Sequence, residues 1–169
     1  MIVNFLQRLL WVLGLVLLQV MVFNHIHLFG YATPLISVYF LLLFPLGTER
    51  WGILLWGFLC GLLCDIASLT LGITMASLTL AAFIQPPLLQ LMAPKDSPED
   101  LQPGFNSMGF WGYVRYALVL TVLFVVAYFL VQYFNFFHPL DFAVSVVSSW
   151  ALTFVLCLVF EGFRYKFHS

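Results

Sequence analysis

The chain has 169 residues, of which 63% are hydrophobic and only 8% are charged, and its net charge is −1. Soluble domains carry about 25% charged residues, so this composition excludes a water-soluble fold and predicts an integral membrane protein. The near-neutral charge offers no basic surface for nucleic acid, and the spans leave no room for an extramembrane domain, so we expect one membrane domain over residues 1–169.

Six hydrophobic stretches follow one another along the chain. A helix needs about 20 apolar residues to cross a hydrocarbon core about 30 Å thick, and lipid forces the backbone to satisfy its own hydrogen bonds. We therefore predict an all-α, six-transmembrane-helix bundle. The helices are expected at about 5–23, 30–46, 51–68, 72–92, 113–134 and 141–163.

Three details of these spans are open or unusual. The second span is short, so it either crosses fully or is partly re-entrant. Pro86 and Pro87 fall near one end of the fourth span and predict a kink or an early end there, because proline lacks an N–H donor. Residues 93–112 form the only long polar connection.

Every Lys and Arg falls in alternate gaps between the spans. These residues are Arg8, Arg50, Lys95, Arg115, Arg164 and Lys166. Under the positive-inside rule they predict that both termini and the 93–112 loop are cytoplasmic. The first stretch is interpreted as a retained helix and not a signal peptide, because residues 24–27 offer no small-residue cleavage site.

The third span carries the most informative pattern. Gly57, Gly61 and Asp65 recur every four residues and therefore share one helical face, on which small residues let another helix approach closely. Asp65 lies about 21 Å along the helix from Trp51 and so in the outer part of the membrane. It could contact an ion, a substrate or a partner, but we favour a helix-end aspartate that caps the turn before the next helix.

A second group of polar residues is expected at the outer face. His25, His27, His138 and Asp141 fall in the outer connections and could line a pocket or a metal or proton site. Their spacing matches no known ligand signature, so we predict neither a metal nor any other cofactor. The chain also lacks a recognisable catalytic constellation, which predicts that it is not an enzyme.

Two further groups are assigned structural roles. Glu161 and Arg164 are spaced for an i,i+3 ion pair at the inner end of the sixth helix. The cysteines are predicted to be small core residues and not a disulfide framework; they are Cys60, Cys64 and Cys157.

Several segments together resemble the MreD family of rod shape-determining proteins. They are residues 31–36 entering the second helix, 49–52 opening the third, the glycine-spaced segment 57–65, and the Leu-Gly turn at 71–74. Within them Gly57, Gly61, Asp65 and Gly72 match the family segment, and the likeness in size and hydropathy covers roughly residues 5–165.

The resemblance implies a non-enzymatic part of the bacterial cell-elongation machinery in the inner (cytoplasmic) membrane. Members of that family associate with MreC, and through it with the MreB cytoskeleton and the transpeptidase and glycosyltransferase that synthesise peptidoglycan. The family is also similar in fold to the S components of energy-coupling-factor transporters. That similarity leaves an alternative function open, namely a small-solute-binding subunit of a transporter.

Overall fold

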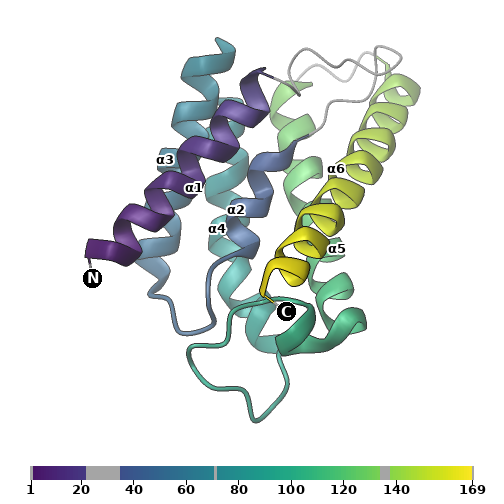
Figure 1. Ribbon diagram of the computed structural model, residues 1–169. Helices are drawn as coiled ribbons and strands as arrows, with labels where there is room; N and C mark the ends of the chain where they lie inside the picture. The colour runs from purple at the N-terminus through teal and green to yellow at the C-terminus, as the bar shows by residue number, and fades with distance from the viewer. Residues whose placement is uncertain (1, 22–34, 71, 134–137, 169) are drawn as a thin grey trace.

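The computed structural model describes residues 2–21, 35–70, 72–133 and 138–168, and the regular secondary structure in these ranges is entirely helical (Figure 1). The elements are α1 (Ile2–Met21), the 3₁₀ turn η2 (Ile36–Val38), α2 (Tyr39–Leu42), α3 (Arg50–Ser68), α4 (Ile73–Met92), α5 (Phe105–Gln132) and α6 (Pro139–His168). Five of them, all except η2 and α2, are long and apolar enough to cross a membrane. The chain is a multi-pass helical membrane protein.

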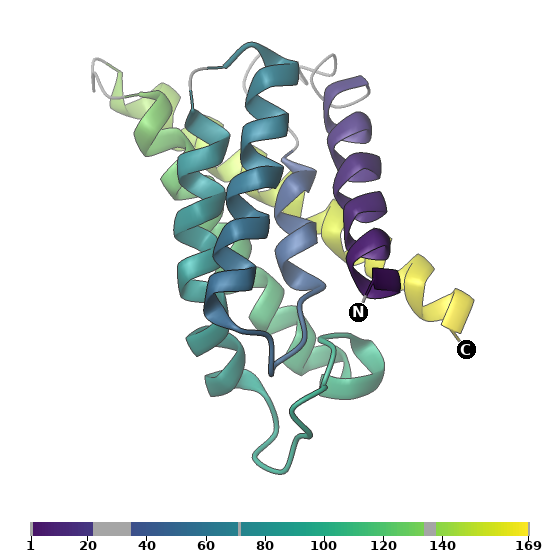
Figure 2. The same cartoon turned by 90° about the vertical axis from the view of Figure 1, so that its left-hand side faces the viewer.

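The long helices pack in chain order around the short one. Each of α3, α4 and α5 contacts the next helix along the chain, α1 lies against α3, and η2 contacts α1, α3, α4 and α6. Figures 1 and 2 show the long helices running between two ends of the bundle, with α2 between them. The connection before α3, the loop between α4 and α5, and both chain ends lie at the same end (Figure 1).

The second predicted helix can be compared with the structure only from residue 35 onward, because residues 30–34 lie outside the described ranges. We expected a helix over 30–46, but from residue 35 on helical structure covers only Ile36–Leu42, so the helix ends earlier than expected. Every residue of that segment is buried, so neighbouring helices replace lipid around it. The backbone N–H of Leu35 donates to Thr153 Oγ1 of α6 at 3.1 Å, and that of Ile36 donates to Gln19 Oε1 of α1 at 2.8 Å. A short helix survives here because side chains of its neighbours bond the N–H groups that helix starts leave unsatisfied.

One boundary agrees with its prediction and another differs. Helix α4 continues to Met92, as the predicted span 72–92 has it, with no early end at its prolines, and Pro86 is buried within it. Packing against the helices on either side offsets the hydrogen bonds that the prolines cannot make. Helix α5 begins at Phe105, inside the predicted 93–112 loop, and turns at Gly109, where a φ of 72° requires a residue that tolerates left-handed backbone.

The end that holds both chain ends is called the basic end here, because all six Lys and Arg residues belong to segments at or near it. Backbone hydrogen bonds join two connections at this end, the segment between α2 and α3 and the loop between α4 and α5. Leu46 N–H donates to Leu101 O at 3.0 Å and Gly47 N–H donates to Glu99 O at 2.6 Å. A Cβ at Gly47 would lie 2.8 Å from that same carbonyl oxygen, so the close approach requires glycine. The loop after α4 is thereby fixed beneath α2.

Candidate functional site

The glycine face of α3 packs against α4. A Cβ added at Gly57 would lie 2.9 Å from the Ala82 Cβ, and one at Gly61 would lie 2.5 Å from the Met75 Cα. Both approaches are closer than side chains normally allow, so these glycines are what lets α3 and α4 touch. This face of α3 is therefore covered by α4 of the same chain and is not free for a partner.

Asp65 holds the turn between the same two helices. Its Oδ1 accepts hydrogen bonds from Thr70 Oγ1 at 2.6 Å and from the Thr74 N–H at 3.0 Å, and its Oδ2 accepts from the Met75 N–H at 2.9 Å. The two N–H groups belong to the first turn of α4, where a carboxylate also complements the helix dipole. The carboxylate is 3% exposed. This geometry agrees with the predicted capping role.

The turn itself needs two left-handed residues. Leu69 ends α3 with a φ of 55°, and Gly72 precedes α4 with a φ of 75°. Leucine adopts this backbone at a cost of about 1–2 kcal/mol. The Asp65 carbonyl compensates by accepting hydrogen bonds from the Leu69 N–H and, at 3.0 Å, from the Thr70 N–H.

The predicted outer residues are only partly described. His25 and His27 lie outside the described residues. His138 and Asp141 are exposed at the start of α6, where the His138 carbonyl accepts the N–H of Phe142 at 3.1 Å. The outer pocket therefore stays a prediction.

A buried polar cluster lies near the basic end, where α6 meets α2 and the 93–104 loop. Glu161 is 3% exposed, accepts a hydrogen bond from Tyr39 Oη at 3.1 Å, and pairs with Arg164 at 3.3 Å. The ion pair confirms the i,i+3 prediction. Arg164 also donates to Pro103 O at 3.2 Å and to Gln102 Oε1 at 3.0 Å. The cluster thus joins three segments that are distant in sequence.

Gly104 allows the loop to reach this cluster. A Cβ there would lie 2.8 Å from Glu161 Oε1. With Tyr39 on one side and Arg164 on the other, the buried carboxylate has both a hydrogen-bond donor and an opposite charge, which a charged group needs in such surroundings. The predicted Glu161–Arg164 ion pair is thus one of several contacts within this polar cluster.

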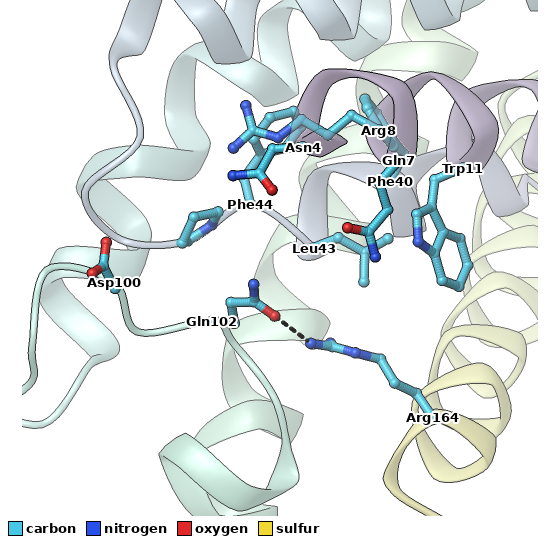
Figure 3. A pocket seen from close by; sticks show the side chains of 11 residues that line it. Asn4, Gln7, Arg8, Trp11, Phe40, Leu43, Phe44, Asp100, Gln102 and Arg164 are labelled. Atoms are coloured by element: carbon cyan, nitrogen blue, oxygen red, sulfur yellow. Dashed lines mark hydrogen bonds between the residues drawn. The ribbon is translucent and has the colours of Figure 1, made fainter. Parts of the chain in front are cut away.

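A cleft of about 650 Å³ opens beside the cluster. Its lining is mostly polar along α1 and the loop, and apolar along α2 and the segment after it, as Figure 3 shows. The Arg8 guanidinium lies over the Phe44 ring, 5.3 Å from its centroid. The lining residues are Asn4, Gln7, Arg8, Trp11, Phe40, Leu43, Phe44, Pro45, Asp100, Gln102 and Arg164.

Sequence reasoning missed this cleft, although one signal for it was present. Asn4, Gln7, Arg8 and Trp11 are spaced i, i+3, i+4 and i+7, so they form one stripe on α1. Nothing local in the sequence, however, indicated that α6 would bring Arg164 to face the same space.

An apolar hollow, called the α3–α4 groove here, lies between exposed side chains of α3 and α4. This groove, of about 450 Å³, is open to the surroundings and almost wholly apolar. It is lined by Leu54, Phe58, Met75, Ala76, Thr79, Leu80 and Phe83. It lies beside the glycine contacts that draw the two helices together, so a further helix could enter between their side chains.

These features define a class of protein, a helical bundle that spans the membrane several times, with a polar cleft at its basic end. No protein-family model, curated protein or solved structure matches the chain.

Proposed function

We propose that this chain is a non-enzymatic membrane scaffold of the bacterial cell-elongation machinery, an MreD-like protein that binds MreC and helps control peptidoglycan synthesis and cell shape. The observation that carries the proposal is the apolar α3–α4 groove. A scaffold of this kind works by helix–helix recognition in the lipid, and this groove supplies a surface for it.

The groove has the side chains that favour such contact. Ala76, Thr79, Leu80 and Phe83 follow one another at i, i+3, i+4 and i+7 along α4, so they form one stripe. Small residues at a helix interface let the backbones approach, and the Phe and Leu side chains at its edges provide packing area. Phe83 is 67% exposed and Leu80 is 50% exposed, so both side chains are available to a partner.

The resemblance supports the same assignment. One of the segments that resemble MreD, residues 57–65, carries the glycines that bring α3 against α4, and it contributes Phe58 to the groove. A partner would therefore be bound beside the glycine face and not on it. With the basic end in the cytoplasm, as the positive-inside rule predicts, the protein would have both termini there and would reach the wall synthases of the elongation complex through MreC.

Photocrosslinking within native membranes tests the proposal. A photoreactive amino acid at Leu80, inside the groove, should crosslink to MreC, whereas the same group at Val147 should not. Val147 is a matched control because it is 60% exposed and lies on α6, away from the groove.

The two proposed functions give different results in affinity capture after gentle solubilisation. MreC and the wall synthases should be recovered with the wild-type chain. Recovery of a transport ATPase in their place would reject the scaffold and favour the solute-binding alternative. Equal crosslinking from Leu80 and Val147 would reject the groove as the binding surface.

A further inference from the structure

The cleft at the basic end presents donors to an anion. Asn4, Gln7, Arg8 and Trp11 approach it from one stripe of α1. Figure 3 shows the Asn4 amide beside the Arg8 guanidinium and the Gln7 amide pointing into the cleft near Leu43. Amide, guanidinium and indole groups all donate hydrogen bonds, and guanidinium is well suited to phosphate. The α1 side of the cleft is therefore rich in donors.

The charges around the cleft are not equally available. Arg164 is already paired with Glu161 and bonded to Gln102, so its charge is largely compensated. Arg8 has no carboxylate partner among the described residues and rests on the Phe44 ring. The exposed Asp100 carboxylate lines the cleft as well and would disfavour a second anion. These charges therefore favour the binding of one anionic group, beside Arg8.

The polar cleft continues into an apolar groove along α1, which is separate from the α3–α4 groove. This α1 groove, of about 400 Å³, runs towards Phe160 of α6 and shares Gln7 and Trp11 with the cleft. Its other lining residues come from successive turns of α1; they are Leu10, Gly14, Leu15 and Leu18. Trp11 lies at the junction, where an indole suits the boundary between headgroups and acyl chains.

We propose that the cleft and the groove together bind one anionic phospholipid. The phosphate lies beside Arg8 in the cleft, and an acyl chain lies along α1 in the groove. A charged compartment that opens directly into an apolar one matches an amphiphile and not a water-soluble phosphate. The cleft volume of about 650 Å³ falls within the usual size range of ligand sites, about 300–1,000 Å³. This proposal does not depend on the identity of the protein partner.

Native mass spectrometry of the purified, delipidated full-length protein tests this proposal. We expect phosphatidylglycerol to bind at least about tenfold more tightly than phosphatidylcholine with the same acyl chains. Both lipids carry the phosphate, but the choline cation of phosphatidylcholine is repelled by Arg8 and offsets the attraction of its phosphate. Glycerol phosphate, which has the headgroup without the chains, should not bind measurably.

Three variants separate the two compartments. Arg8→Gln should reduce phosphatidylglycerol binding to the level of phosphatidylcholine. Arg50→Gln, at an exposed arginine of the basic end outside the cleft, should leave it unchanged. Gly14→Leu should weaken both lipids by filling the groove, and it should fold normally because a Cβ there meets nothing within 4 Å.

Several results would overturn the proposal. An equal loss of binding in the Arg8 and Arg50 variants would mean that only diffuse charge acts. Undiminished lipid binding by Gly14→Leu would place the acyl chain elsewhere. Binding of glycerol phosphate as tight as that of the lipid would identify a soluble phosphate as the ligand. If Arg8→Gln does not fold, Arg8→Lys must retain the preference for phosphatidylglycerol, and loss of that preference would count against the proposal.

Discussion

Replacing Asp65 with alanine should lower the free energy of unfolding by about 3–4 kcal/mol, because each backbone N–H left buried without an acceptor costs about 1–3 kcal/mol. Two such groups depend on the carboxylate, the N–H groups of Thr74 and Met75. The Thr70 hydroxyl, which is its third donor, can rotate to another acceptor and adds little. The loss should therefore come mainly from the first turn of α4.

Asp65→Asn should fall between the wild type and alanine, at a loss of about 1–2 kcal/mol. The amide oxygen can keep the bonds that Oδ1 now accepts, but the amide nitrogen would face the Met75 N–H, so one bond is lost. The charge on the helix dipole, worth about 0.3–1 kcal/mol, is lost as well.

Unfolding of the purified protein in mixed micelles, followed by far-ultraviolet circular dichroism, measures both changes. Asp96→Ala is the matched control, since that side chain is exposed in the 93–104 loop and its loss should change the free energy by no more than about 0.5 kcal/mol. An Asp65→Ala protein as stable as the control would refute the capping role. A stable Asp65→Asn protein that no longer assembles with its partner would show that the charge itself is needed.

Three other predictions concern helix contact, the buried short helix and orientation. Gly61→Leu would bring a Cβ to 2.5 Å from the α4 backbone and should prevent α3 from docking, seen as loss of monodisperse protein in size-exclusion chromatography. Gly52→Leu should behave as wild type, because a Cβ there meets nothing closer than 4.0 Å. Thr153→Val leaves the N–H of Leu35 without its acceptor and should lower the free energy of unfolding by about 1–3 kcal/mol; no change in chemical unfolding would mean that this bond does not stabilise the segment. A cysteine introduced as Lys95→Cys should react with an impermeant maleimide only in opened spheroplasts, because the positive-inside rule predicts that this loop is cytoplasmic. The native cysteines are buried and should not react. Labelling of intact spheroplasts would instead place the basic end outside.

The long helices followed from the sequence because hydropathy and length are local properties. The predicted spans at 51–68 and 72–92 agree closely with α3 and α4, and the three cysteines are buried and free as expected. The role of Asp65 was also accessible, because its partners lie 5, 9 and 10 residues away in the chain. Over such short separations the spacing of glycines and a turn restricts what the residues can contact.

The second span shows why the same reasoning fails elsewhere. Hydropathy could not limit its helix to Ile36–Leu42, because its short length depends on acceptors supplied by other helices. One of these, Thr153, is 118 residues away from Leu35. The start of α5 at Phe105 was missed because prolines, glycines and charged residues dominate 93–104 and glycines interrupt 105–112, so the few apolar residues there do not mark a helix.

The sequence by itself determined that this chain crosses a membrane as helices, which residues of its third span let another helix approach closely, and in which connections the cations lie. It could do so because lipid imposes length and apolarity on each span separately. Only the tertiary structure decided that Tyr39 meets Glu161 across 122 residues, and that Arg8 and Arg164 face one cleft. Those contacts depend on how whole helices pack together. The hydrophobic periodicity of one helix does not indicate which distant helix will lie beside it.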